Sequence, residues 1–466
     1  MSVRPLEDGQ PPTHPRRKSQ HTGDMPGGGR GRHSLGSGGE DRLGALGRQL
    51  PRAEPPQIVQ ALALERARRV LRHSIWLVLV VAIVVYIAVQ LLRPYPGPAF
   101  RPAVKGSVRL PGSVPSLPLP TSGSAAIALV GGGTLARSGG TQPVPVGGLI
   151  KVLTAYVVLR DHPITNGEGG PAITVTSDAV ADYQTGIHNQ EQEIAVSAQE
   201  TLTELQALQG LLVAGANDMG TLLADWDAGD AAGFVTKMNA VARSLGLAAT
   251  HAADPNGLDA TTVSTPEDLI QLGEAAMAIP AFAEVVGAAE VTLPMAGVVF
   301  NTNFALGHDG IVGIRTGVLP ASGGCFLFEA HQMKAGQQLS LIGAVLGQQT
   351  ASPTRAAVSA AEAMVQAAFA ASGPVPTFAS GASVGRIVSA WGASVAVVPA
   401  GDPSVVAWPG LTVSATMRHE PLSSNITAGT KVGTEVLDIG GQHVEVALRA
   451  GGPLPGPSLL WRLSRF

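Results

Sequence analysis

Cysteine, aromatic residues and charged residues are all scarce in this sequence. The single cysteine, Cys325, cannot form a disulfide within the chain and cannot supply a thiolate metal cluster. No metal or nucleotide-binding signature occurs either, so we expect no metal and no cofactor. Basic residues number 31 and acidic residues 34, and this balance gives no global field that would hold nucleic acid.

Charged residues make up 14% of the 466 residues, against ~25% in an average soluble domain. At ~150 residues per domain the chain has room for about three units. Residues 1–73 combine Pro, Gly, Ser and Arg without apolar periodicity, so we predict a disordered cytoplasmic tail there.

A long apolar run follows the tail. Ile75 to Leu92 carries no charge and is apolar except for Gln90. At ~1.5 Å per residue this run covers ~27 Å, about one hydrocarbon core, so we predict a transmembrane helix over residues 74–93. Its depth in the chain and its basic flanks favour an uncleaved signal anchor. The alternative is a buried core helix, which is rarely so uniformly apolar.

The orientation of this helix follows from the basic residues close to it. Those before it form one short cluster, whereas those after it are spread through a Pro-rich segment, residues 94–122. The two groups are Arg66, Arg68, Arg69 and Arg72, then Arg93, Arg101, Lys105 and Arg109. This asymmetry predicts a single-pass protein with a cytoplasmic N-terminus and extracytoplasmic main domains. The prolines of 94–122 predict an extended stalk.

Two folded domains are predicted beyond the stalk. Residues 123–373 favour an α/β domain, with a buried helix over Leu149–Arg160, three consecutive strands and a closing helix over Thr354–Ala371. The strands are Gly310–Gly317, Cys325–Glu329 and Leu339–Leu346. Their order indicates an antiparallel sheet flanked by helices. Thr201 and Glu204 predict a capping box. Short Val-rich runs over 374–466 predict an all-β domain.

Lys151 stands out because it is surrounded by apolar residues near the start of a buried helix. An ammonium group is costly to bury without a partner. Either its stem packs while its head reaches solvent, or the amine has a chemical role.

The string Gly148-Leu-Ile-Lys151-Val-Leu-Thr154-Ala155 resembles the active-site helix of the D-alanyl-D-alanine carboxypeptidases, which are low-molecular-weight penicillin-binding proteins and serine peptidases. That family has Ser-x-x-Lys followed by Thr-Ala. Here the serine position is Gly148. Gly215-Ala-Asn217 resembles the family's Ser-x-Asn segment, again with glycine for serine, and Arg315-Thr316-Gly317 resembles its Lys-Thr-Gly strand. Asp254 to Asp259 also matches the family pattern.

The resemblance implies a penicillin-binding-protein-like α/β domain and a ligand, the D-Ala-D-Ala end of peptidoglycan stem peptides, in a bacterial cell envelope. It assigns Lys151 as the base, Asn217 as the residue that orients the substrate, and Arg315, Thr316 and Gly317 as substrate-binding. Without the resemblance, Arg315 is also explained by a surface ion pair and Asn217 by a helix cap.

The two missing hydroxyl groups belong to positions that perform the covalent step in the family. We therefore expect a protein that binds stem peptides but is catalytically impaired. The alternative is a functioning carboxypeptidase with a non-standard nucleophile, such as water activated by Lys151.

Overall fold

The computed structural model describes residues 55–103, 106–165, 167–379 and 381–465, in two units, Met1–Ile83 and Val84–Phe466. Helix α1 (Pro55–Leu92) contains one segment, Leu62–Leu92, that is long and apolar enough to cross a membrane. Residues 55–73 are therefore helical and not disordered as predicted, because Ala, Leu, Glu and Arg there are good helix formers. The rest of the predicted tail, residues 1–54, lies outside the described residues.

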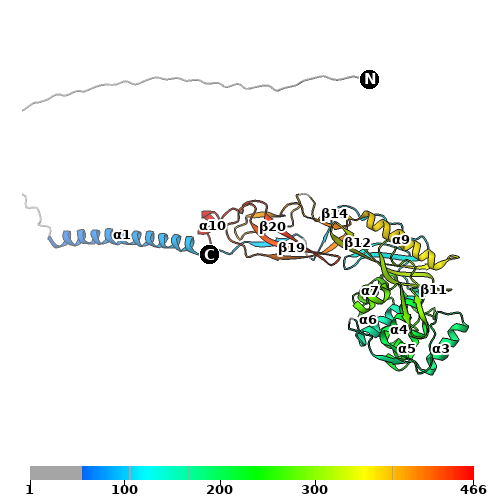
Figure 1. The fold of residues 1–466 in the computed structure, drawn as a ribbon. Coiled ribbons are helices and arrows are strands. Elements are labelled where there is room, and N and C mark those ends of the chain that lie inside the picture. Colours follow the sequence, from blue (N-terminus) through cyan, green and yellow to red (C-terminus); the bar gives the residue numbers. More distant parts are fainter. Residues whose placement is uncertain (1–54, 104–105, 166, 380, 466) are drawn as a thin grey trace, which may run out of the picture. The chain divides into compact units, whose positions relative to one another are not determined.

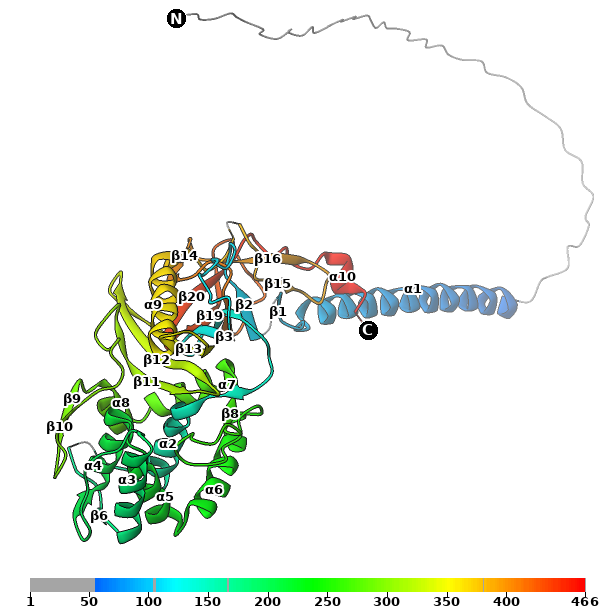
Figure 2. The same ribbon diagram turned by 90° about the vertical axis from the view of Figure 1, so that its right-hand side faces the viewer.

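A five-stranded antiparallel sheet carries the helical part of the second unit. Its strand order is β11-β12-β13-β3-β4. The strands are β3 (Ser124–Leu129), β4 (Gly133–Ser138), β11 (Ile311–Leu319), β12 (Gly323–Lys334) and β13 (Gln337–Gln348). Helix α9 (Pro353–Ala371) packs on β12 and β13, and the helices between residues 151 and 287 lie across the opposite face, as Figures 1 and 2 show. The predicted sheet and closing helix are confirmed.

Both faces of this sheet are buried, so successive residues of one strand enter different cores. On β12, Cys325 and Leu327 join the core under the helical lobe, whereas Phe326 and Phe328 join the core under α9. Side chains alternate between the two faces of a strand, which explains this division. Cys325 is fully buried, and burial raises the pKa of its thiol to about 11.

The helical lobe surrounds α2 (Lys151–Asp161), which follows a short 3₁₀ helix, Gly147–Ile150. The other helices are α3 (Ser177–His188), α4 (Glu204–Gln209), α5 (Asn217–Ala228), α6 (Ala231–Ser244), α7 (Pro266–Met277) and α8 (Pro280–Gly287). Three two-stranded ribbons pair β5 (Val144–Pro145) with β8 (Val263–Ser264), β6 (Ala172–Thr174) with β7 (Thr201–Thr203), and β9 (Glu290–Leu293) with β10 (Gly297–Phe300). The capping box lies at Thr203 and Gln206, not at Thr201 and Glu204 as predicted, because the β7 strand occupies the first of these positions.

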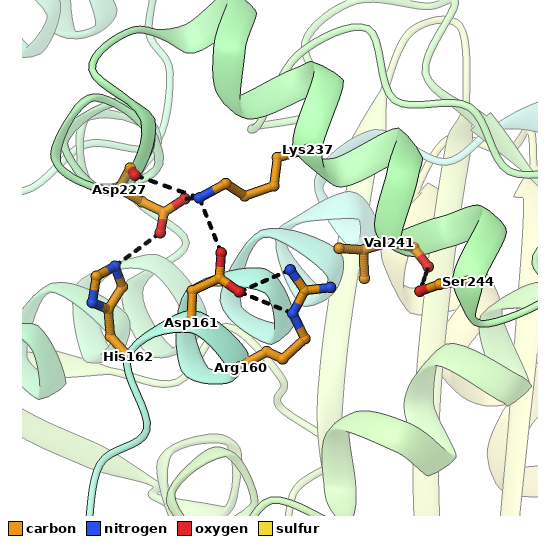
Figure 3. Close-up of polar contacts among 7 residues, drawn as sticks. All are labelled: Arg160, Asp161, His162, Asp227, Lys237, Val241 and Ser244. Atoms are coloured by element: carbon orange, nitrogen blue, oxygen red, sulfur yellow. Dashed lines mark hydrogen bonds and ion pairs between the residues drawn. The ribbon is translucent and has the colours of Figure 1, made fainter.

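Ion pairs fix the C-terminal end of α2 against α5 and α6 (Figure 3). Asp227 on α5 accepts from His162 at 2.9 Å and pairs with Lys237 of α6 at 2.5 Å. Lys237 also pairs with Asp161 at 2.9 Å. The Asp227 side chain is fully buried, so its two partners compensate the cost of removing the carboxylate from water. The contacts hold α2, and with it Lys151, in one position.

The C-terminal part forms a seven-stranded antiparallel sheet of order β1-β15-β16-β20-β19-β18-β2. Its strands are β1 (Ala99–Pro102), β2 (Gly106–Arg109), β15 (Gly385–Val388), β16 (Ser394–Pro399), β18 (Thr412–His419), β19 (Lys431–Ile439) and β20 (Gln442–Ala450). A ribbon of β14 (Gly373–Pro376) and β17 (Ser404–Ala407) accompanies it, and helix α10 (Leu459–Leu463) ends the fold.

The predicted stalk does not stand free of this domain. β1 pairs with β15 and β2 pairs with β18, so residues 94–122 supply both edge strands of the seven-stranded sheet. Proline is tolerated in edge strands because only one side of such a strand donates to a neighbour. The remaining domain boundaries stay predictions.

Candidate active site

Lys151 is the first residue of α2, and its side chain is only 2% exposed. Its Nζ donates to Asn217 Oδ1 at 2.5 Å and to the Asn256 carbonyl at 2.9 Å. The amine therefore does not reach solvent, and of the two interpretations of Lys151 the structure supports the buried, partnered one. Asn256 belongs to the loop that Asp254 organises by accepting from the backbone N–H groups of residues 256–259.

The pKa of Lys151 is lowered from 10.5 to about 7, mainly by burial and also by the positive charge of Arg315. Asp254, Glu193 and Glu191 oppose this shift. A substantial fraction of the amine is therefore neutral at neutral pH, so that its lone pair can accept a proton.

This shift predicts that Lys151 contributes a pH dependence of stability, which Lys151→Met removes. Between pH 7 and 10.5 the unfolded chain binds a proton at Lys151 that the folded chain has lost, so this contribution to the free energy of unfolding rises with pH. Asp218, whose pKa is raised to about 8, contributes in the opposite direction below that pH in both proteins, so the difference between the two profiles isolates Lys151. The slope for one group reaches ~1.4 kcal/mol per pH unit. Urea denaturation of both chains from pH 7 to 9.5 measures it. Parallel profiles for the two proteins would show that Lys151 titrates normally.

Gly148 lies in the 3₁₀ helix before Lys151 and has no side chain to react. A Cβ atom at this position would lie 3.8 Å from Lys151 Nζ and 3.5 Å from Arg315 Nη2, which are ordinary contact distances. The space for a small side chain beside the amine therefore exists. The structure brings Gly148, Lys151 and Asn217 together as the sequence predicts.

Asn217 begins α5, directly after Gly215 and a π-helical turn, Gly210–Ala214. Its Nδ2 donates to Glu191 at 3.2 Å and to Glu193 at 3.4 Å, so its Oδ1 is turned toward Lys151. Two further acidic groups, Glu191 and Glu193, therefore accept hydrogen bonds from the Asn217 amide nitrogen. Sequence reasoning missed them, because the polar run around residue 190 has no motif spacing.

A pair of acids, the buried Asp218 and the half-buried Glu193, lies next to Asn217. Glu193 accepts from the Asp218 backbone N–H at 2.7 Å, and burial raises the pKa of the Asp218 carboxyl to about 8, with Glu193 contributing in the same direction. Asp218 is therefore mostly protonated at neutral pH.

Arg315 on β11 is 2% exposed and enters the interior of the site. Its Nε donates to the Gly148 carbonyl at 2.9 Å and its Nη1 to the Leu212 carbonyl at 2.8 Å. Burial lowers the pKa of the guanidinium to about 10, which leaves it charged at neutral pH. The interpretation of Arg315 as a surface residue in an ion pair is wrong, because its partners are buried backbone carbonyls.

The guanidinium also occupies the room that a side chain at residue 215 would need. A Cβ atom at Gly215 would lie 2.9 Å from Arg315 Nη2 and 2.7 Å from Gln192 Oε1, and Gly215 has φ of +85°. A serine is therefore disfavoured at residue 215 both by backbone conformation and by space. Arginine at 315 and glycine at 215 fit each other, a coupling that no sequence spacing reveals.

Thr316 and Gly317 differ in their position relative to the cavity beside Lys151. The Thr316 hydroxyl donates to the Thr302 carbonyl at 3.2 Å, and Thr316 does not line the cavity beside Lys151, because neighbouring strand residues face opposite sides. Its predicted role in substrate binding stays a prediction. Gly317 does line the cavity, and its backbone approaches the 3₁₀ helix so closely that a Cβ would lie 3.1 Å from Leu149 N.

Gly317→Ala should therefore weaken the packing of β11 against the 3₁₀ helix that precedes α2. The added methyl group meets backbone atoms of residues 146, 148 and 149, which cannot move aside as a flexible side chain can. Overpacking of this kind costs ~1–3 kcal/mol. A lower midpoint in urea with an unchanged slope is the expected result. Gly373→Ala, at a β14 strand position that like Gly317 has no positive φ but has no atom within 4 Å of the added Cβ, controls for loss of glycine.

A cavity of about 350 Å³ opens beside these residues. Those with charged or amide side chains are Lys151, Asn189, Gln190, Glu191, Gln192, Asn217, Asn256 and Arg315. Glycine, leucine, valine and proline complete the lining. Among the described residues of this lining, none carries a hydroxyl or a thiol.

Comparison with known proteins gives consistent results. The family model described as D-alanyl-D-alanine carboxypeptidase matches residues 122–350. A D-alanyl-D-alanine carboxypeptidase of Mycobacterium tuberculosis is 32% identical over 185 residues, which cover 38% of this chain and 59% of that relative. Another, from Streptomyces sp. strain K15, is 28% identical over 250 residues, 48% of this chain and 84% of that protein.

Among solved structures, the Streptomyces K15 DD-transpeptidase aligns with a TM-score of 0.48 at 24% identity, covering 56% of this chain and all of that one. A penicillin-binding protein homologue from Mycobacterium tuberculosis aligns with a TM-score of 0.45 at 27% identity, covering 58% and 96% of the two chains. The family match covers the motifs around Lys151, Asn217 and Arg315. Residues 122–350 of this chain therefore match the D-alanyl-D-alanine carboxypeptidase family, and the relatives found are penicillin-binding-protein-like peptidases.

Proposed function

We propose that this chain is a membrane-anchored receptor of the bacterial cell envelope that binds the D-Ala-D-Ala end of peptidoglycan stem peptides without forming an acyl-enzyme. The observation that carries the proposal is the combination of a retained Lys151–Asn217 hydrogen bond with Gly148, which has no side chain to acylate. The cavity lining provides no other hydroxyl or thiol among its described residues.

Non-covalent binding of a stem peptide needs no nucleophile in the site, whereas acylation does. Arg315 uses Nε and Nη1 on backbone carbonyls, and Nη2 has no partner among the described residues. We infer that this last group pairs with the terminal carboxylate of the peptide, in a low-dielectric site where a charge-assisted hydrogen bond is strong. Asn217 would orient the peptide backbone, as the family resemblance implies.

Membrane anchoring is supported by the residues around the last turns of α1. The Tyr86 hydroxyl donates to the Leu463 carbonyl at 2.8 Å, and Tyr95 packs edge-on against Trp391 at 5.4 Å and Trp461 at 6.4 Å. Arg462 lies over the Tyr95 ring. Aromatic rings with nearby cations are typical of membrane–water interfaces. We infer a single span with a cytoplasmic N-terminus, from the basic cluster before the run.

The test measures binding and turnover on the same sample. The full chain, in lipid nanodiscs, is titrated calorimetrically with a diacetylated Lys-D-Ala-D-Ala peptide, and free D-Ala is assayed after long incubation. We expect saturable binding, loss of binding when the terminal D-Ala carboxylate is amidated, and no D-Ala release. Absence of saturable binding of the free-acid peptide would refute the receptor function.

A functioning carboxypeptidase is the second candidate, and the lowered pKa of Lys151 favours it. A neutral amine could take a proton from water as its oxygen attacks the penultimate carbonyl, with the proton then passing to the leaving D-Ala nitrogen. D-Ala release that Lys151→Ala abolishes would establish this alternative. Release that survives in Lys151→Ala would point to a contaminant.

A further inference from the structure

A groove on the surface of helix α1 contains basic residues that precede the apolar run. It measures about 440 Å³, and every residue that lines it belongs to α1. The lining residues are Arg66, Arg69, Val70, His73, Ser74 and Leu77. Spacings of three, four, seven and eleven residues place side chains on one face of a helix, so the groove follows a single face of α1. The groove is basic at its outer end and apolar where it enters the run, at Leu77.

The two arginines of this groove have no partner among the described residues. Both side chains are exposed, and neither guanidinium forms a hydrogen bond or an ion pair in the part of the chain that the structure describes. His73 Nδ1 donates to the Arg69 carbonyl at 2.6 Å, which holds the imidazole on the same face. Glu65 is the only acidic residue in the sequence of α1. The groove therefore presents positive charge that the described residues do not neutralise.

With Ile75–Leu92 in the hydrocarbon core, the groove lies at the depth of phospholipid headgroups. His73 and Ser74 come directly before the uncharged run, and Arg69 lies ~9 Å from Ile75 along the axis, at ~1.5 Å per residue. The headgroup layer is ~5–7 Å thick on each side of a bilayer. Arginine side chains are long enough to extend from the helix into this layer. Leu77 lies one turn inside the hydrocarbon, so the groove crosses the boundary between headgroups and acyl chains.

We propose that this groove binds one anionic phospholipid, with its phosphodiester on Arg66, Arg69 and His73 and the start of an acyl chain on Leu77. The inference rests on the membrane anchoring proposed above. Complementary charge favours this occupant, since each arginine near an anionic membrane surface contributes about fivefold in affinity. A second copy of this chain fits less well, because two such faces would bring like charges together. Inorganic phosphate would pair with the basic residues but leave the apolar part of the groove uncovered.

Native mass spectrometry of the full chain in detergent micelles, titrated with phosphatidylglycerol or phosphatidylcholine, tests this site. Both lipids have a phosphodiester, but only phosphatidylglycerol has a net negative charge. We expect one phosphatidylglycerol to bind about tenfold or more tightly than phosphatidylcholine. Arg66→Gln and Arg69→Gln should each weaken phosphatidylglycerol binding about fivefold, and the double variant should remove most of the preference.

Arg68→Gln combined with Arg72→Gln is the matched control. These two arginines lie at a similar depth on α1 but do not line the groove. The control variant should therefore keep the preference for phosphatidylglycerol within about twofold of the wild type. Equal losses in the two double variants would show a diffuse attraction between a basic helix and anionic lipid, and would overturn the proposed site.

Three other results would also overturn it. The first is the absence of any preference between the two lipids. The second is a dimer of the chain without bound lipid, which would assign this face to a second copy. The third is displacement of phosphatidylglycerol by inorganic phosphate. Flotation with phosphatidylcholine liposomes tests the anchoring separately: a chain that does not float contradicts both proposals, whereas one that floats without a lipid preference contradicts only this one.

Discussion

Gly148→Ser should make this protein react covalently with labelled penicillin, whereas we expect the wild type to stay unlabelled. A serine at this position places its Oγ one bond beyond a Cβ that lies 3.8 Å from Lys151 Nζ. The amine, with its pKa lowered to about 7, can then accept the hydroxyl proton as the oxygen attacks the lactam carbonyl. Loss of the nucleophile in a serine hydrolase costs ~10⁶ in turnover, so a large gain is expected.

Space and backbone conformation both permit this substitution. Gly148 has no positive φ, and the nearest atoms to the added Cβ are the side-chain nitrogens of Arg315 and Lys151 at contact distance. Gly215→Ser differs, since it combines a φ of +85° with a 2.9 Å contact to Arg315. We therefore expect Gly148→Ser alone to fold like the wild type, and the addition of Gly215→Ser to lower stability without improving the label.

Two matched variants isolate the hydroxyl. Gly148→Ala adds the Cβ without oxygen and should remain unlabelled. Gly148→Ser combined with Lys151→Met retains the oxygen without the base and should lose most of the label. Gel fluorescence of the full chain with a fluorescent penicillin, followed by mass spectrometry of the modified peptide, measures all three. A folded Gly148→Ser protein that stays unlabelled would mean that the site lacks more than a nucleophile.

The sequence motifs predicted which residues lie close together but not which contacts their side chains make. Gly148, Lys151 and Asn217 come together because they follow a local spacing on helices whose apolar residues dictate burial. Arg315 lies more than one hundred residues away from Leu212, the backbone partner of its Nη1. The inward direction of the guanidinium depends on the room at Gly148 and Gly215, which is a property of tertiary packing.

The same distinction separates the correct and incorrect parts of the predicted fold. The strands β12 and β13 each contain an apolar run, Cys325–Phe328 and Leu341–Leu346, because both faces are buried there, and such runs can be recognised locally. The segment 94–122 has the composition of a free linker, yet it supplies edge strands to β15 and β18, which follow it by nearly three hundred residues. Pairing with a distant strand leaves no local pattern in a Pro-rich segment.

Trp408→Ala should produce the largest loss of stability among single core substitutions in the C-terminal part. Trp408 is fully buried, and its Nε1 donates to the Ala368 carbonyl of α9 at 2.6 Å. The core around it contains Phe326 and Phe369 of the α/β domain together with Leu437 of the seven-stranded sheet. Truncating a buried tryptophan costs ~3–5 kcal/mol through lost burial and the cavity it leaves.

Urea denaturation followed by circular dichroism measures this loss, and Trp408→Phe is the matched control. Phenylalanine keeps most of the apolar volume and removes only the N–H donor, so its cost should be closer to ~1 kcal/mol. Because one core joins α9 to the β domain, we expect both regions to unfold in a single transition that shifts as a whole. Two transitions, of which Trp408→Ala moves only one, would show instead that the β domain folds independently and that the shared core contributes little to the coupling.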